Sequence, residues 1–251
     1  MAYNNTGEVH HGGVANEKEV CAFLTAKNHY GCEVLHQGGT KQVEDGESIN
    51  GDKVSIKRWK GATHDWFNST PAAKASGFKS LIEDFISTFK EDIKEIPDTD
   101  HYTFRKQKEA ELNTFIAEQL DNICTEDFAY YVLHSFAEHT EDMDVVISDV
   151  KNSQLHIYQF NDHPAVKLLN DGYTPTIISK SGKLTASRSI FMVKGDQKVD
   201  VGLRVRFSTN NGLKPYTNEG SPNKSTTPVV KLQQDDVAKL LQSVKKVSYS
   251  I

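Results

Sequence analysis

Residues 45 to 57 read Asp-Gly-Glu-Ser-Ile-Asn-Gly-Asp-Lys-Val-Ser-Ile-Lys, an acidic residue and a glycine-containing turn followed by a short β-type run. The central Asn-Gly pair favours a hairpin, and strand alternation places Ser55 and Lys57 on one face. A two-residue turn would set Asp45 opposite Ile56, whereas a three-residue loop that includes Asp52 would set it opposite Lys57. We expect the second register, because it puts Asp45 and Lys57 on the same face.

Helical and strand patterns extend on both sides of this hairpin. Residues 1–13 are expected to be a polar arm or loop, and apolar residues then recur at helical spacing to about Asn28, with Asn16 as N-cap. After a loop at 61–72, helices are expected at about 81–96, 102–120 and 125–138, with Thr125 as the cap of the last. The period then changes towards two, which predicts strands at 145–147, 154–160, 176–178, 189–193, 201–207 and 229–232, followed by a short helix at 235–244.

This order of elements predicts an α/β protein with a central mixed β-sheet flanked by helices. A chain of 251 residues is long enough for one large domain or two small ones. We expect a single domain over residues 1–251, with the catalytic core and a helical cluster in about 14–150 and a β-rich region in about 151–251. The polar stretch 208–227 is read as a long loop.

Composition narrows the cellular context. No apolar run approaches the length of about 20 residues that spans a bilayer, and the first residues show no secretory pattern. The three cysteines, Cys21, Cys32 and Cys124, form no metal or disulfide motif. The sequence therefore predicts a soluble protein of the cytoplasm that does not associate with membranes.

Charge is distributed unevenly along the chain. The protein has a net charge of −5, but ten basic and three acidic residues between Ile178 and Lys231 give that segment +7 and leave −12 for the rest. Such asymmetry is typical of a localised anion-binding face. A solvated lysine-rich surface is the plainer alternative.

The hairpin holds residue types suited to metal-assisted phosphodiester cleavage. A hard divalent cation bound by carboxylates neutralises charge on a phosphate and lowers the pKa of bound water, and a lysine stabilises the anionic nucleophile. Of the two glutamates on the first expected helix, Glu17 lies on the same face as Val20, Cys21 and Leu24, whereas Glu19 lies towards the helix edge.

Three patches of the chain resemble the PD-(D/E)xK nuclease superfamily, and in particular its small type II restriction endonucleases. Asp45, Ser55 and Lys57 are similar to the Asp…(Asp/Glu)-x-Lys core, and residues 13–20 (Gly-Val-Ala-Asn-Glu-Lys-Glu-Val) resemble the start of the first helix of such enzymes. Residues 203–212 and 225–233 resemble a terminal β-ribbon that reads DNA. The resemblance implies that Asp45 and Glu17 bind Mg²⁺, that Lys57 assists the attacking water and that Ser55 lines the site.

Ser55 departs from the superfamily pattern, which has a carboxylate there. Some branches of the superfamily compensate from the first helix, which would make Glu17 functional. Glu44 and Asp52 are alternates for the acidic position, although Glu44 would face away from Asp45 and Asp52 belongs to the turn. The remaining alternative is that Asp45 is an ordinary turn residue and Lys57 an exposed strand residue.

The candidate DNA contacts lie in the basic C-terminal half. On the strand at 201–207, Leu203, Val205 and Phe207 are expected to face the core while Arg204 and Arg206 project from the other face. Arginine pairs with guanine edges, asparagine with adenine, and serine or threonine with phosphate. The complete set of predicted contacts is Arg188, Arg204, Arg206, Ser208, Thr209, Asn210, Asn211, Lys214 and Lys224.

The sequence thus predicts Mg²⁺-dependent hydrolysis of double-stranded DNA at a short specific sequence, with a homodimer suited to a palindromic site. One alternative is a repair, recombination or viral genome-processing nuclease of the same fold. Another is a DNA-binding protein that cleaves nothing, on a degenerate nuclease fold. The ten histidines form no metal motif and are read as surface residues, and no nucleotide-binding loop or serine hydrolase elbow is present.

Overall fold

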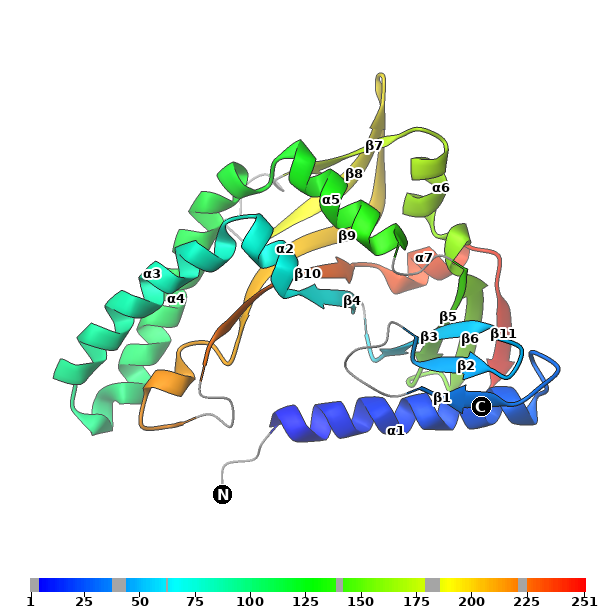
Figure 1. Cartoon of the computed structure of the whole chain (residues 1–251), viewed down its shortest axis with the longest axis horizontal. Coiled ribbons are helices and arrows are strands. Elements are labelled where there is room, and N and C mark those ends of the chain that lie inside the picture. The colour runs from blue at the N-terminus through cyan, green and yellow to red at the C-terminus, as the bar shows by residue number, and fades with distance from the viewer. Residues whose placement is uncertain (1–4, 38–43, 62, 139–141, 179–185, 221–224) are drawn as a thin grey trace. The chain divides into compact units, whose positions relative to one another are not determined.

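The computed structural model describes all residues except 1–4, 38–43, 62, 139–141, 179–185 and 221–224, and the side chains of residues 5–13, 67–68 and 138 are also left aside. The described chain forms a mixed α/β protein with two β-sheets and flanking helices, as expected in general terms (Figure 1). It divides into two compact units. Unit 1 comprises residues 1–64, 135–172 and 235–251, and unit 2 comprises residues 65–134 and 173–234. Each unit therefore combines chain from both sides of residue 150.

Unit 1 is built on a six-stranded mixed sheet, here called sheet A. Its strands are β1 (Val34–His36), β2 (Gly46–Ser48), β3 (Lys53–Trp59), β5 (Met143–Asp149), β6 (Gln154–Gln159) and β11 (Val247–Ser250), in that spatial order. β3 and β5 pair in parallel and the other neighbours are antiparallel. Because β3 and β5 lie in the middle of the sheet, Val54, Val145 and Val146 are fully buried.

Helix α1 (Asn5–Ala26) packs along sheet A (Figure 1). Val20, Cys21 and Leu24 contact a hydrophobic cluster from β1, β3, β5 and β6 that includes Val54 and Ile56. The described helix begins at Asn5, so the expected arm is wrong for residues 5–13, while residues 1–4 lie outside the described residues. The expected N-cap at Asn16 is wrong as well. Asn16 lies inside the helix, where its side-chain oxygen accepts a hydrogen bond from Ser148 Oγ at 2.8 Å. This partner satisfies a buried amide that would otherwise be costly inside a helix.

The hairpin between β2 and β3 adopts neither of the two registers considered above. Gly46 pairs with Val54 and Glu47 with Lys53, so the loop consists of residues 49–51. The Ser48 hydroxyl sets this turn, because it donates to Asp52 Oδ2 at 2.5 Å and accepts from the Asp52 N–H at 2.9 Å. Asp45 precedes β2, and its N–H donates to the Val54 carbonyl at 2.9 Å. Its side chain still lies on the face of Ser55 and Lys57, because it contacts both.

Unit 2 is built on a five-stranded sheet, here called sheet B, with the order β4 (His64–Ser69), β10 (Thr227–Gln234), β9 (Gln197–Asn210), β8 (Ser187–Lys194) and β7 (Thr174–Ile178). Helices α2 (Thr70–Ala75), α3 (Phe78–Asp92), α4 (His101–Ile123) and α5 (Glu126–Glu138) follow β4. Phe207 on β9 packs against Phe78 of α3 and Phe128 of α5, with ring centroids 5.0 and 5.8 Å apart. One face of sheet B is therefore covered by helices (Figure 1).

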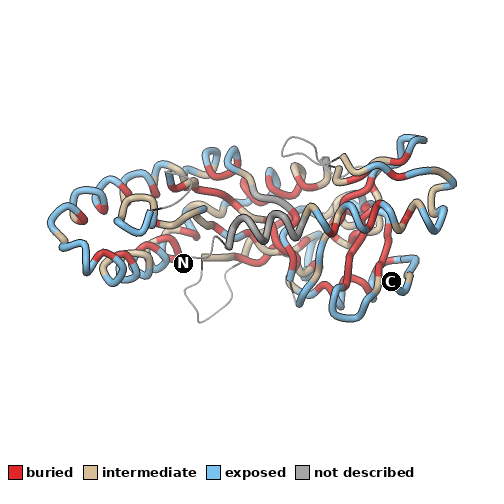
Figure 2. Tube along the Cα trace, turned by 90° about the horizontal axis from the view of Figure 1, so that it is seen from below, coloured by how far each residue is buried: buried red, intermediate tan, exposed pale blue. Residues whose placement is uncertain are grey.

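The long helices of unit 2 follow the expected periodicity. Phe78, Ile82, Ile86 and Phe89 of α3 are buried, and the tube in Figure 2 alternates buried and exposed segments along such helices. Thr125 caps α5 as predicted, since its Oγ1 accepts from Phe128 N at 3.2 Å. Short turns of 3-10 helix, η1 (Ile93–Glu95) and η2 (Asp98–Asp100), join α3 to α4 around Pro97.

Several short elements lie outside the expectations. β4 and α2 occupy the expected loop at 61–72, and α6 (Pro164–Asn170), η3 (Phe160–Asp162) and β11 are further additions. The expected closing helix is α7 (Val237–Ser243), capped by Asp236, whose Oδ1 accepts from Lys239 N at 2.9 Å. None of the helices in the described part of the chain has the length and apolar character that a bilayer crossing requires.

Candidate functional site

Asp45 is the centre of a polar cluster in unit 1. Its Oδ2 accepts from the Ile56 N–H at 2.6 Å and from Ser55 Oγ at 3.4 Å, and it lies 3.8 Å from Lys57 Nζ. The side chains of Asp45 and Lys57 are 25% and 19% exposed. The hairpin thus brings together the three residues that the sequence predicted, although through a different turn.

Burial raises the pKa of Asp45 above its ordinary value. The Lys57 charge and the Ile56 N–H lower it, the charge of Glu17 raises it, and the Ser55 hydroxyl lowers it, but desolvation is the largest effect. The pKa stays raised although Lys57 Nζ lies 3.8 Å away, so the lysine does not fully compensate the cost of burying the ionised carboxylate. Perturbation of this kind is common at functional sites.

Glu17 extends the cluster from α1. It is half-buried while Glu19 is exposed, which agrees with the choice of Glu17 as the inward carboxylate. Its Oε2 lies 3.0 Å from His36 Nε2 at the end of β1. Glu17 and Asp45 also act together on Cys21: burial first, then Asp45 and Glu17, raise the pKa of its thiol to about 11. Cys21 is therefore a protonated packing residue and no nucleophile.

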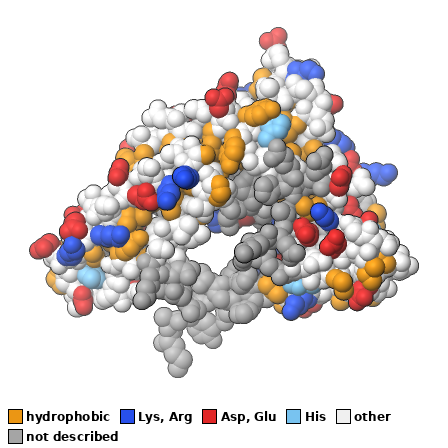
Figure 3. Space-filling view, in the orientation of Figure 1, with side chains coloured by type: hydrophobic (Ala, Val, Ile, Leu, Met, Phe, Trp, Pro, Cys, Tyr) orange, Lys and Arg blue, Asp and Glu red, His pale blue; other side chains and the backbone are white. Residues whose placement is uncertain are grey.

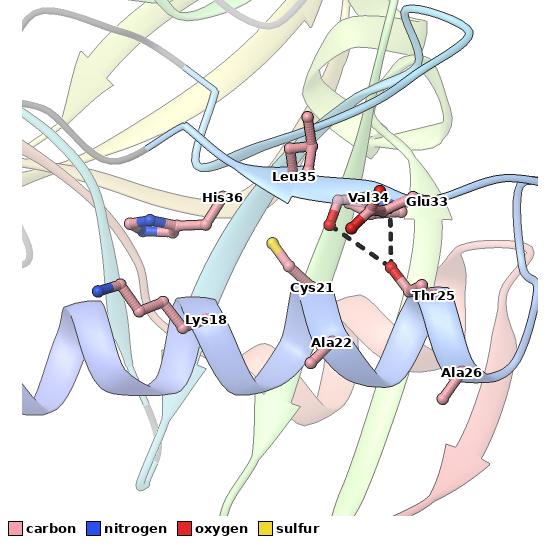
Figure 4. Close-up of a pocket in the computed structure, with 9 residues that line it drawn as sticks. All are labelled: Lys18, Cys21, Ala22, Thr25, Ala26, Glu33, Val34, Leu35 and His36. Atoms are coloured by element: carbon pink, nitrogen blue, oxygen red, sulfur yellow. Dashed lines mark hydrogen bonds between the residues drawn. The ribbon is translucent and has the colours of Figure 1, made fainter.

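An open hollow of about 560 Å³ runs between α1 and β1 beside this cluster (Figure 4). Lys18 and His36 line one end of it, and Thr25 lies towards the other, where its hydroxyl accepts from Val34 N at 2.9 Å. Cys21 points from α1 towards β1. The hollow leaves the His36 end of the cluster open to solvent.

The donor chemistry of Asp45 and Glu17 fits Mg²⁺, which takes oxygen ligands and is bound in proteins through one or two carboxylates plus waters. Within the described residues, all partners of the Asp45 carboxylate contact Oδ2 and the partner of Glu17 contacts Oε2. Oδ1 and Oε1 are therefore the carboxylate oxygens left available to an ion by these contacts. The same part of the chain contains no group of three or more His, Cys, Asp or Glu residues suited to a metal, so waters and a phosphate would complete the coordination.

Sheet B presents a second polar surface in unit 2. Leu203, Val205 and Phe207 are buried as predicted, while Arg206 is exposed and Arg204 half-buried on the opposite face. Neighbouring strands add residues to that face through the register, since Ser187 and Lys231 lie opposite Arg206, and Ser189 and Gln233 lie opposite Arg204. We call these six residues the polar face of sheet B.

Three contacts order the polar face of sheet B. Arg204 Nε donates to Gln233 Oε1 at 3.2 Å, and Gln233 in turn donates to Asp65 on β4. Lys231 Nζ lies 3.6 Å from Asp65 Oδ2. Sequence reasoning missed Lys231 as a candidate contact, because only the strand pairing places it beside Arg206.

Other predicted DNA contacts have different surroundings. Arg188 is 4% exposed, and its guanidinium donates to Asp121 Oδ1 at 3.0 Å and to the Ala117 carbonyl at 3.1 Å, so it holds β8 to α4 and is not displayed. Ser208, Thr209 and Asn210 belong to β9, because each of them pairs with a residue of β10. The loop begins only at Asn211. Lys224 lies outside the described residues.

The loop after β9 is tied to helix α4. Arg105 is 5% exposed and pairs with Glu109 at 2.9 Å and with Glu219 at 2.5 Å, while Glu109 also accepts from Leu213 N at 3.3 Å. The Arg105 hydrogen bond lowers the pKa of Glu219. This loop includes the turn η4 (Lys214–Tyr216), whose Lys214 is exposed. The predicted contact Lys214 is thus displayed on an anchored segment.

The expectation that the histidines are surface residues is wrong for several of them. His64, His101, His156 and His163 are buried, and His36 pairs with Glu17. These four buried histidines are part of the packed interior of the protein, although the sequence shows no metal motif around them. Only the spatial contact with Glu17 singles out His36, since 19 residues separate the two in sequence.

Charges are mixed over the helical face of unit 2. Figure 3 shows Lys and Arg interspersed with Asp and Glu along α3 and α4. The pairs Lys79–Glu83 and Lys108–Glu111, at 3.5 and 2.9 Å, are examples. Alternating signs of this kind give little net attraction for a polyanion.

No protein-family model matches the chain, and neither the curated proteins nor the solved structures give a match. The class of the protein is therefore the one that its own architecture defines, a mixed α/β protein with two sheets flanked by helices.

Proposed function

We propose that this protein is a Mg²⁺-dependent endonuclease of double-stranded DNA, with a restriction-endonuclease-like unit 1 and a DNA-contacting sheet B. The observation that supports this most strongly is the half-buried Asp45 carboxylate, which lies 3.8 Å from Lys57 Nζ and whose pKa is nevertheless raised by burial. A bound divalent cation would supply the missing positive charge.

The proposed reaction adds water across one P–O bond. The water oxygen forms a bond to phosphorus, the bond from phosphorus to the leaving oxygen breaks, and the leaving oxygen takes up a proton while the water proton passes to solvent. Bound Mg²⁺ would neutralise charge on the phosphate and lower the pKa of the water. Lys57 stabilises the anionic nucleophile and Asp45 orients Lys57. Ser55 holds the Asp45 carboxylate.

The polar face of sheet B supports DNA as the substrate. Arg204 and Arg206 lie two residues apart on the same face of β9, and Lys231 of β10 pairs with Arg206. Paired strands of this kind can enter a groove or follow a phosphate backbone. Recognition of a short specific sequence, and a homodimer on a palindromic site, belong to this proposal.

One observation favours the rival in which the protein binds DNA without cleaving it. Ser55 stands where a third acidic group would complete the site, and the described residues hold no cluster of three metal ligands. A structure-specific repair or genome-processing nuclease is the other rival, which keeps the same chemistry.

The test is incubation of the purified protein with long duplex DNA in Mg²⁺, Mn²⁺ or EDTA, followed by sequencing of the ends. Discrete termini in Mg²⁺ and none in EDTA are expected. Cleavage confined to branched or single-stranded substrates would favour the structure-specific nuclease. Salt-sensitive binding without cleavage in either metal would overturn the proposal in favour of the binding protein.

A further inference from the structure

We infer that His36 is a positioning residue of the candidate metal site, which acts by holding the Glu17 carboxylate in place. The inference rests on the proposed function, because it assigns a role within that site. It starts from the contact between His36 Nε2 and Glu17 Oε2 at 3.0 Å, where the two side chains are 16% and 22% exposed. An N–H on Nε2 donates to the carboxylate in this geometry.

The backbone fixes His36 next to the strand that holds Asp45. His36 is the last residue of β1 and pairs with Gly46, and the following Gln37 N–H donates to the Asp45 carbonyl at 3.1 Å. Gly46 faces α1 so closely that an added Cβ would lie 2.8 Å from Cys21 Sγ. His36 therefore projects towards α1 from a position that is one residue removed from Asp45.

Glu17 gains order from this contact. A glutamate on a helix surface has three rotatable side-chain bonds, and fixing them costs conformational entropy when a ligand binds. His36 engages Oε2, so it fixes the carboxylate before an ion arrives and leaves Oε1 for the ion. Hydrogen bonds to ligating carboxylates have this orienting role in metal sites, and their loss costs about 10- to 100-fold in metal affinity.

Direct coordination by His36 is the less favoured arrangement. Among the described residues no group of three or more His, Cys, Asp or Glu is placed to share a metal, although Glu17, His36 and Asp45 all lie in the cluster. Mg²⁺ also prefers oxygen to imidazole nitrogen. The expected role of His36 is thus to act through Glu17.

The experiment measures thermal unfolding of the full chain, without DNA, over a titration with MgCl₂ or MnCl₂. The variants are His36→Ala, His36→Gln and Asp45→Asn, with His29→Ala as control. Gln retains an N–H donor at a comparable distance from the backbone. His29 is also half-buried in unit 1, where its ring nitrogen Nδ1 lies 2.8 Å from Tyr249 Oη and its ring packs against Tyr30 and Tyr249, so it controls for the loss of a partly buried histidine elsewhere in the unit.

The metal is expected to stabilise the wild-type protein against thermal unfolding and to leave the Asp45→Asn variant without this stabilisation. His36→Ala is expected to need about 10- to 100-fold more metal for half of the effect, His36→Gln to recover part of that loss, and His29→Ala to match the wild type.

The outcomes separate the two proposals. Metal-dependent stabilisation that is equal in wild type and His36→Ala would overturn the role of His36 and leave the proposed function standing. An equal loss of metal affinity in His29→Ala would overturn it too, because the effect would then be general destabilisation. Absence of stabilisation in the wild type, or an undiminished effect in Asp45→Asn, would contradict the proposed metal site itself.

Discussion

Lys57 Nζ lies 3.8 Å from Asp45 Oδ2 on the hairpin of sheet A, and yet the pKa of Asp45 is raised. An exposed ion pair at this distance would lower the pKa of the carboxyl group. Burial therefore outweighs the lysine, and the ionised carboxylate has a net cost in the folded protein. This cost is the physical reason to expect a cation at the site.

Replacement of Lys57 by Met is expected to lower the rate of DNA cleavage at saturating Mg²⁺ by about 10²- to 10⁴-fold, because the aliphatic stem remains while the charge near the nucleophile is lost. The pKa of Asp45 will rise further, since the Lys57 charge lowers it. Single-turnover cleavage is the measurement. Lys53→Met, an exposed change on the same strand, is the control, and equal rates in both variants would contradict the role of Lys57.

Replacement of Ser55 by Asp is expected to place a second acidic group beside Asp45. Ser55 is 2% exposed, so a second carboxylate there should destabilise the protein by about 1–3 kcal/mol in EDTA. Mg²⁺ should then stabilise this variant more than it stabilises the wild type. Ser55→Asn is the control, because Asn has the shape of Asp without its charge. The measurement is urea unfolding with and without metal. Equal metal effects in the two variants would show that position 55 does not face the ion.

Arg206→Ala is expected to weaken DNA binding and to reduce the salt slope of log K by about one, because a phosphate contact releases about one counterion. Arg206 is exposed on β9 and lies opposite Lys231. Fluorescence anisotropy at several salt concentrations is the measurement. Lys94→Ala, which removes an exposed cation paired with Glu91 at 2.7 Å, is the control. An unchanged slope in Arg206→Ala would remove that residue from the DNA contacts.

Arg105→Met is expected to destabilise the protein by about 3 kcal/mol, because two partly buried carboxylates lose their common partner. The pKa of Glu219 is lowered in the folded state, so its stabilising contribution is present above its ordinary pKa and is lost as pH falls through the lowered one. The difference from wild type in urea unfolding should therefore shrink in acid. Lys79→Ala, an exposed pair with Glu83, should cost less than about 0.5 kcal/mol. A pH-independent difference would contradict this assignment.

Much of the fold follows from local patterns. Helices α3, α4 and α5 were predicted because their apolar residues recur at helical spacing over several turns, and the strands from β5 to β10 because their period is two. The start of α1 was missed, since residues 5–13 are polar, include three glycines and have weak intrinsic helix propensity. The sequence predicts a loop where β4 lies. In the structure the burial of its residues alternates as in a strand, with His64 and Trp66 buried and Asp65 exposed.

The candidate site was predicted only in part, because its contacts are not local. Asp45, Ser55 and Lys57 come together through a hairpin, which sequence patterns indicate. The turn itself depends on the Ser48 hydroxyl and Asp52, which no propensity describes. The contact of His36 with Glu17 and the pairing of Lys231 with Arg206 exist only after the sheets have formed.

The central claim is that Asp45 is retained for metal binding at a cost in stability. Since its folded pKa is raised, its favourable contribution is present below the unfolded value and is lost as pH rises through the folded value. Asp45→Asn keeps an oxygen for the Ile56 N–H and removes the charge. In EDTA at pH 8 the variant should therefore be at least as stable as the wild type.

The most direct measurement compares wild type and Asp45→Asn for DNA cleavage in Mg²⁺ and for urea unfolding in EDTA at pH 8. We predict that the variant loses cleavage by about 100-fold or more while its free energy of unfolding is unchanged or higher. Undiminished Mg²⁺-dependent cleavage by a folded Asp45→Asn protein would contradict the account.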